Sequence, residues 1–399
     1  MQGNAVGQKS MWLAASAIGL LYEGSTLLTP LYPTYRREFH FSELVVTTVY
    51  AVYVIGNLAV LFFFGRLSDQ IGRRRTTLIA LALTCASTLL FLFAGSVAWL
   101  YPARILNGFA AGLGAGALTA WIAELEPHGD RLRAAVVASA ANLVGLGFGA
   151  LLSGVLAQLA PWPLRTPYVV FLVLLLVLAA LLVTTRETVE RPVRAIDELE
   201  LRPRIGVPRN LRLAFVAPAA IAFTAFALGG FYAALAPDLL ARSLQRHEPV
   251  VIGGIVALFF VSGALAAVAS RALRGRSAML AALALLWIGL GLLTLAEALH
   301  SMALLVLASV LTGASTALGY RGSLQIINEI APARQRAEMV SSYLLVCYSA
   351  NALPVIGVGV LALFIGAPGA HRVFAIVLVV LATLACAIGM RHLQSVSRD

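Results

Sequence analysis

The stretch GRLSDQIGRRR, residues 65–75, places four arginines and one aspartate between two long apolar segments. Glycine stands at Gly65 and Gly72, where a tight turn between two helices needs close approach or unusual backbone angles. An acid in so basic a loop needs a partner. We therefore expect Asp69 to pair with a neighbouring arginine or to lie at the N-terminus of another helix. Such a contact would hold one side of a helical bundle shut and break when that side opens.

The chain around this loop is strongly apolar. Its 399 residues are 60% hydrophobic and only 12% charged, and the mean hydropathy is +0.89. Soluble domains carry roughly 25% charged residues, so we infer that lipid covers most of this protein. A helix needs about 20 apolar residues to cross a bilayer. Twelve segments approach or exceed that length, at residues 11–33, 44–64, 76–95, 97–121, 134–159, 168–185, 214–235, 250–270, 278–296, 302–320, 339–365 and 372–390.

The net charge of +11 follows from membrane topology. Most of the 29 Lys and Arg residues fall in every second loop, which is the positive-inside pattern. This pattern places both termini in the cytoplasm and the chain in the cell inner (plasma) membrane, and it argues against a nucleic-acid partner. The three cysteines all lie within spans and indicate neither disulfides nor a metal site. Since no nucleotide-binding or nucleophile motif appears, we expect no enzyme and no cofactor.

The sequence repeats itself at an offset of 205 residues. ILNGFAAGLGAG (105–116) aligns with VLTGASTALGYR (310–321), and IAELEPHGDR (122–131) aligns with INEIAPARQR (327–336) without a gap. We infer two six-helix halves, residues 1–186 and 213–399, joined by a charged cytoplasmic linker at 187–212. Parallel repeats of this kind describe a transporter architecture whose substrate site lies between the halves.

The loop quoted above resembles the loop 2–3 signature of the major facilitator superfamily. Gly65, Asp69, Gly72, Arg73 and Arg74 match that signature, while Gln70 stands where the family usually has Arg or Lys. The resemblance covers essentially the whole chain. It implies an all-α membrane fold of twelve helices in two pseudo-symmetric bundles, working as a monomer by alternating access.

Two further segments resemble family motifs in spans 4 and 5. LYPARILNGFAAG (100–112) has Arg104 and Gly108 in place, with Asn107 where Gln is common. GLGFGALLSG (145–154) is similar to the span 5 motif of proton-coupled exporters. It keeps Gly145, Gly149 and Gly154 but has Ala150 for Pro and Ser153 for Gly. Glycines at this spacing either mark an antiporter, where they let the helix flex, or simply let two helices pack closely.

Glu23 is the acid that stands in the middle of a span. Ionisable groups within spans are costly, so each is a functional candidate. With Ser16, Gly19 and Thr26 it forms a small or polar stripe at helical spacing, flanked by Tyr22. Three roles stay open: a proton-binding group in a transport cycle, a partner for a cationic substrate, or a structural hydrogen bond.

Arg104 is the second intramembrane charge. It could serve as the counter-ion of Glu23, as an anchor for an anionic substrate, as part of a proton relay, or as a cap on backbone carbonyls. The family resemblance favours the relay.

Further residues are candidates for the substrate cavity or for switching. The amides Asn107, Asn142 and Asn351 lie within spans, and Tyr232 lies near the outer end of its span. Pro354 interrupts the backbone hydrogen bonds of span 11, and Gly357 softens the helix nearby. Each could equally be a packing residue.

Charged residues at the span ends have more local roles. Glu124 is expected to form a gating salt bridge with Arg73 or Arg74. Glu297 and His300, three residues apart in a short turn, are interpreted as surface residues, with a pH-sensing pair as the alternative.

The sequence therefore predicts a secondary transporter of small molecules in the lipid bilayer, with protons as the coupling ion. Proton-coupled efflux of drug-like compounds or metabolites is the main expectation. The alternatives are proton-linked uptake or facilitated diffusion of a nutrient, and a non-transporting membrane sensor on the same scaffold.

Overall fold

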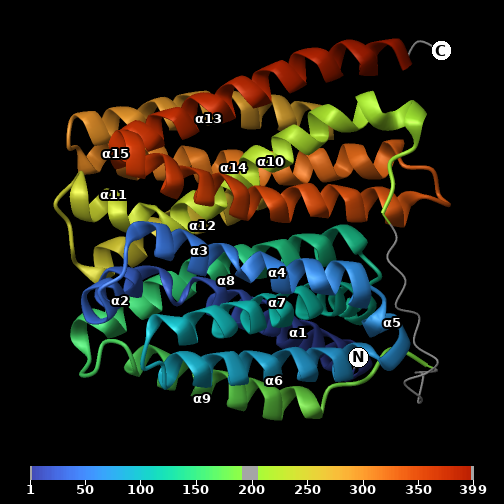
Figure 1. Ribbon diagram of the computed structural model, residues 1–399. Helices are drawn as coiled ribbons and strands as arrows, with labels where there is room; N and C mark the ends of the chain where they lie inside the picture. The colour runs from blue at the N-terminus through green and yellow to red at the C-terminus, as the bar shows by residue number, and fades with distance from the viewer. Residues whose placement is uncertain (1, 191–204, 397–399) are drawn as a thin grey trace. The chain divides into compact units, whose positions relative to one another are not determined.

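The computed structural model describes residues 2–190 and 205–396, and this part of the chain is built from helices (Figure 1). Long apolar segments without interior turn signals form helices because only internal hydrogen bonding satisfies the backbone in lipid. In chain order the helices are α1 Gln2–Thr26, α2 Tyr32–Phe39, α3 Glu43–Ala51, α4 Tyr53–Ala59, α5 Leu67–Ile71, α6 Arg73–Leu92, α7 Val97–Leu125, α8 Arg131–Leu159, α9 Thr166–Val183, α10 Arg212–Ala234, α11 Ala236–Arg242, α12 Pro249–Ala269, α13 Gly275–Ala298, α14 Met302–Ile330 and α15 Arg336–Val396.

Eleven helical segments in the described residues are long and apolar enough to cross a membrane. The last of them contains a break at Gly366, whose φ of 74° and ψ of 161° are not helical. A side chain at such a positive φ would be strained, so glycine is required there. Because α15 is two helices joined at this residue, the predicted all-α fold with twelve spans is confirmed.

The chain divides into two compact units. Unit 1 comprises residues 1–42, 52–203 and 248–257, and unit 2 comprises residues 43–51, 204–247 and 258–399. The predicted linker, residues 187–212, lies partly outside the described residues, because 191–204 are not described. Two short helical pieces belong to the unit built mainly from the other half of the sequence: α3 to unit 2, and the first part of α12 to unit 1.

The two units repeat one packing scheme. In unit 1, α7 packs on α6, and α1 packs on both α8 and α7; in unit 2, α14 packs on α13, and α10 packs on both α15 and α14. The glycine of the sequence repeat has the same role in each unit. A Cβ on Gly108 would lie 1.9 Å from the Tyr53 carbonyl oxygen, and one on Gly313 would lie 2.1 Å from that of Phe259. The sequence repeat is therefore also a repeat of helix crossings.

The first predicted span is broken, which the sequence analysis did not anticipate. α1 ends at Thr26, a short 3₁₀ turn covers Thr29–Leu31, and α2 follows directly. Pro30 explains the break, since proline has no N–H to continue the helical ladder. The second span is likewise composite: α3 and α4 are followed by a π-helical turn at Val60–Phe64, immediately before the basic loop.

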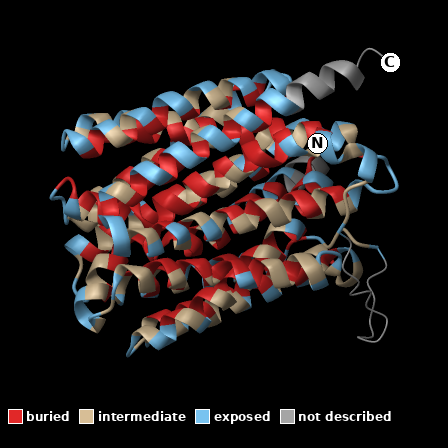
Figure 2. Cartoon of the chain, turned by 45° about the horizontal axis from the view of Figure 1, so that its top comes forward, coloured by how far each residue is buried: buried red, intermediate tan, exposed pale blue. Residues whose placement is uncertain are grey.

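Exposed residues alternate with buried ones along the long helices (Figure 2), and many of the exposed residues are large and apolar. On α9, for example, Leu176 is 56% exposed while Leu175 is fully buried. Large exposed apolar surfaces mark contact with lipid or with other proteins. With the span lengths, they identify a multi-pass membrane protein.

Candidate functional site

Glu23 lies inside unit 1, on α1. Its side chain is 2% exposed, and its Oε1 atom has no hydrogen-bond partner among the described residues. One turn further, Thr26 donates a hydrogen bond of 2.6 Å to the Leu146 carbonyl of α8. Of the predicted stripe, Glu23 and Thr26 are buried, Gly19 is half-buried and Ser16 is exposed, so the end of the stripe near Glu23 faces the bundle interior. A buried acid without a partner costs stability, so the position of Glu23 points to a role beyond packing.

Arg104 is 1% exposed on α7. Its Nη1 donates to the Ser25 carbonyl at 2.9 Å, and its guanidinium lies 4.8 Å from the centre of the Tyr53 ring. The Tyr53 hydroxyl in turn accepts a 3.3 Å hydrogen bond from the Ser25 hydroxyl. Backbone bonding, one of the predicted roles, is thus present, and the carbonyl that accepts belongs to the residue two positions after Glu23.

Two buried amides complete the polar interior of unit 1. Asn107 on α7 is 2% exposed, and its Nδ2 would lie 3.2 Å from a Cβ on Gly24. Asn57 on α4 is also 2% exposed. Within the part of the chain that the structure describes, Asn107 Oδ1 and Asn57 Nδ2 have no hydrogen-bond partner. The sequence analysis missed Asn57, although an amide in the middle of span 2 was visible as a signal. Together these residues leave donor and acceptor atoms available within an apolar bundle.

The other predicted cavity residues differ in burial. Tyr22 on α1 and Asn142 on α8 are half-buried. In unit 2, Tyr232 is fully buried, with its ring stacked on Phe259 at 4.2 Å and its hydroxyl accepting from Thr312. Asn351 accepts a 3.0 Å hydrogen bond from the Tyr50 hydroxyl on α3.

The α8 glycines form a packing seam. A Cβ on Gly145 would lie 2.1 Å from the Gly19 carbonyl oxygen, one on Gly149 would lie 2.3 Å from the Glu23 carbonyl oxygen, and one on Gly154 would lie 2.4 Å from the Pro249 carbonyl oxygen. Close backbone contact thus explains all three. α15 continues as a helix through Pro354, and a Cβ on Gly357 would meet no atom within 4 Å.

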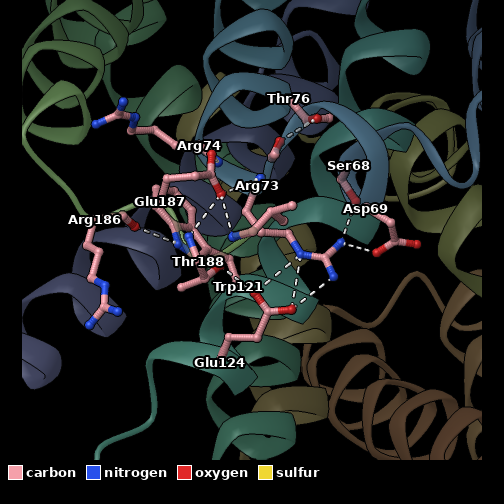
Figure 3. Close-up of polar contacts among 12 residues, drawn as sticks. Ser68, Asp69, Arg73, Arg74, Thr76, Trp121, Glu124, Arg186, Glu187 and Thr188 are labelled. Carbon is pink, nitrogen blue, oxygen red and sulfur yellow. Dashed lines mark hydrogen bonds and ion pairs between the residues drawn. The ribbon is translucent and has the colours of Figure 1, made fainter. Parts of the chain in front are cut away.

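The loop between α4 and α6 carries a charged network (Figure 3). Arg73, the first residue of α6, forms ion pairs with Asp69 of α5 and with Glu124 at the end of α7, where Nη2 and Oε1 are 2.9 Å apart. Its Nη1 also donates to the Ser68 hydroxyl at 2.8 Å. The expected pair between Asp69 and a neighbouring arginine and the expected contact of Glu124 with Arg73 are both present.

Glu187, immediately after α9, caps the N-terminus of α6. The Arg73 N–H donates to Glu187 Oε1 at 2.8 Å, and the Arg74 N–H donates to Oε2 at 3.0 Å (Figure 3). The first N–H groups of a helix lack intrahelical partners and carry partial positive charge, so a carboxylate satisfies both needs. Gly72 has a φ of 108° at this point, and a Cβ on it would lie 2.4 Å from Oε2. The glycine therefore makes room for the cap.

Neighbours of Glu187 attach to the same network. Thr188 donates from its hydroxyl to Glu124, and the Arg74 guanidinium donates to the carbonyls of Val183 and Thr185 at 3.0 and 3.1 Å. The Trp121 indole donates to the Arg186 carbonyl at 3.2 Å. The start of the linker is thus fastened to the basic loop, which the sequence analysis did not foresee.

Glu126 organises the turn between α7 and α8. Its carboxylate accepts from the backbone N–H groups of His128 at 2.7 Å and Asp130 at 2.8 Å, and from Arg133 at 3.1 Å. Burial by itself would raise the pKa of this carboxyl, but the two backbone hydrogen bonds and the Arg133 charge outweigh burial and hold its pKa below the ordinary value.

Glu297 corrects an expectation. The short turn predicts a surface position for Glu297 beside His300, and this prediction is wrong: Glu297 is 5% exposed and bonds to His371, which is 3% exposed. His300 itself is exposed. At the last turn of α13, Glu297 bonds to Ser243 at the end of α11 and to His371 of α15. The sequence of the short turn alone does not predict these contacts.

The fold and its polar interior define a membrane transporter rather than an enzyme. Residues 14–273 match the profile of the Major Facilitator Superfamily, and the chain belongs to that family. A bacterial homolog of the human lysosomal transporter Spinster shares the fold, with a TM-score of 0.68 over 96% of both chains at 14% identity.

Among curated proteins, the chain is 27% identical to Multidrug resistance protein 1 of Bacillus subtilis over 246 residues, which cover 62% of this chain and 61% of that protein. It is 30% identical to the lincomycin resistance protein of Streptomyces lincolnensis over 250 residues, covering 62% of this chain and 46% of that protein. Against the class B tetracycline resistance protein of Escherichia coli it is 28% identical, with 35% of each chain covered. The matched region therefore spans less than two thirds of each of these relatives.

Proposed function

We propose that this protein exports small organic molecules across the cell plasma membrane in exchange for protons, and that Glu23 carries the proton. The observation that carries the proposal is the Glu23 carboxyl, which is 2% exposed in an apolar bundle and whose Oε1 has no hydrogen-bond partner within residues 2–190 and 205–396. Protonation neutralises a buried acid and deprotonation recharges it, so such a group changes the energy of its surroundings on each proton transfer.

The nearby hydrogen bonds support this role. Arg104 donates to the Ser25 carbonyl, and Thr26 donates to the Leu146 carbonyl, so the residues that directly follow Glu23 on α1 are tied to α7 and α8. A charge change at Glu23 would act on backbone that α7 and α8 share. The relatives named for resistance to drugs and antibiotics favour efflux as the direction and drug-like compounds as the substrate class.

The charged network supports alternating access. Arg73 joins Asp69 and Glu124 on one face of unit 1, in a loop that the basic-residue pattern places in the cytoplasm together with both termini. Its ion pairs are partly exposed, with the Glu124 side chain 36% accessible, so they can open at moderate cost. We assign this network a gating role on the cytoplasmic side.

The test uses inside-out membrane vesicles with an acidified interior and a pH-sensitive dye. Ethidium, lincomycin and tetracycline are added in turn to wild type, to Glu23→Gln, and to Glu38→Gln, in which the replaced acid is exposed. We expect compound-triggered proton release in wild type and Glu38→Gln and its loss in Glu23→Gln. Release that survives Glu23→Gln would remove Glu23 from the coupling path, and compound accumulation without proton movement would contradict proton exchange.

A further inference from the structure

Unit 2 contains a buried acid–base pair distant in sequence from Glu23. Glu297, in the last turn of α13, and His371, after the Gly366 break in α15, are 5% and 3% exposed. His371 Nδ1 lies 3.0 Å from Glu297 Oε1. A charged carboxylate is retained in so apolar a place only when hydrogen bonds or an opposite charge compensate its burial.

The groups around the pair come from three elements. Ser243, at the end of α11, donates to the same Oε1 at 2.8 Å. Arg372, next to His371, acts on Glu297 electrostatically. His300 contacts the Ser243 carbonyl through Nδ1. On the same helix as Ser243, Arg242 is engaged by Asp238 at 2.8 Å and by Glu43 at 3.0 Å, so these charges are already paired with one another.

The second ring nitrogen of His371 faces no polar partner. Nε2 is buried without a hydrogen bond among the described residues, and the imidazole lies edge to face with Phe231 at 5.3 Å. Phe231 itself stacks on Phe374 at 5.2 Å. When the neutral ring has its proton on Nδ1, the Nε2 atom carries a free lone pair. Nε2 is then the atom at which the imidazole takes up a second proton.

We propose that Glu297 and His371 form a proton-binding site of unit 2, separate from Glu23, in which His371 Nε2 accepts the proton and Glu297 stabilises the resulting imidazolium. Proton uptake turns a lone buried carboxylate beside a neutral ring into an ion pair with no net charge. The energy of the site therefore depends on pH. Histidine is the side chain suited to such a change near neutral pH.

Ser243 carries the effect to α11. The hydroxyl shares the Glu297 oxygen with His371, and the adjacent Arg242 binds Glu43 of α3. A change of charge at the pair is thus one hydrogen bond away from the end of α11, where Arg242 forms an ion pair with α3. Apolar side chains in the same place would pack α11, α13 and α15 together with equal strength at every pH.

The test observes the proton itself and needs no transport substrate, so its outcome is independent of the proposed export function. The full chain, labelled with 15N-histidine and placed in lipid nanodiscs, is titrated from pH 9 to pH 5 by NMR. The His371 signal is identified by its loss in His371→Gln. A chain in which every histidine except His300 and His371 is replaced by glutamine keeps the His300 contact with Ser243 and leaves two signals, of which His371→Gln removes one.

We expect the two ring-nitrogen signals of His371 to converge as the ring becomes charged within this range. In Glu297→Gln the ring should stay neutral, because the amide offers no charge to stabilise the imidazolium. If that variant does not fold, Glu297→Asp takes its place and should displace the transition. Two results would overturn the proposal. One is a His371 ring that stays neutral over the whole titration when Glu297 is present. The other is a ring that becomes charged over the same pH range after Glu297 is replaced.

Discussion

The Glu187 carboxylate occupies the space that a side chain at Gly72 would need, since a Cβ there would lie 2.4 Å from Oε2. The glycine and the acid are separated by more than a hundred residues, yet each position depends on the other. Glu187 binds the first N–H groups of α6 only because residue 72 has no side chain.

Gly72→Ala should destabilise the protein by at least ~1–3 kcal/mol, the cost of holding a non-glycine residue in a rare backbone conformation. The measurement is the thermal midpoint of the purified chain in detergent. Gly116→Ala is the matched control, because a Cβ there would meet no atom within 4 Å. If both variants melt alike, the backbone and the cap do not require the glycine.

Glu187→Ala and Gly72→Ala should not be additive. Either change removes the carboxylate from the end of α6, and loss of a helix cap costs about 0.5–2 kcal/mol. The double variant should therefore lose less unfolding free energy than the two single variants together. Full additivity in a double-mutant cycle of unfolding in SDS would show that the two residues act independently.

Stability should depend on Glu126 in a specific pH window. Its folded pKa lies below the ordinary value, so its contribution is fully present above the unfolded pKa of about 4.3 and is lost as pH falls through the folded value. Glu126→Gln should thus lower the thermal midpoint at pH 7. The gap to wild type should narrow below about pH 4.3.

The control for that measurement is Glu190→Gln, which replaces an exposed acid. It should track wild type over the whole pH range. A gap for Glu126→Gln that is equally large at pH 3.5 and pH 7 would assign the loss to packing rather than to the charge.

Gly149→Ala should disrupt the contact of α8 with α1. The new methyl would lie 2.3 Å from the Glu23 carbonyl oxygen, and backbone cannot yield as a side-chain end can. Overpacking of this kind costs ~1–3 kcal/mol or more. Gly254→Ala, where a Cβ would meet no atom within 4 Å, should be tolerated. Equal expression and thermal midpoints of the two variants would contradict the close seam.

The spans, the repeat and the charged loop could be predicted because they depend on local sequence. Asp69 and Arg73 are four residues apart and pair across Gly72, while Glu124 lies at the end of the helix that packs on α6. The role of Glu187 could not be predicted, because its partners are backbone N–H groups at the start of α6, more than a hundred residues earlier. No pattern of side chains in the sequence indicates such a contact. Glu297 was misplaced for a related reason: its burial depends on α11 and α15, which a local turn does not encode.

The fluorescence of Trp121 can report whether the start of the linker remains attached to α7. Of the five tryptophans, Trp121 is the one that is fully buried. Its indole N–H donates to the Arg186 carbonyl. The other four are between 43% and 72% exposed: Trp12, Trp99, Trp162 and Trp287. Brominated lipids would quench those four and leave Trp121 emitting. The fluorescence that remains is that of Trp121, and its emission wavelength should shift when the start of the linker separates from α7.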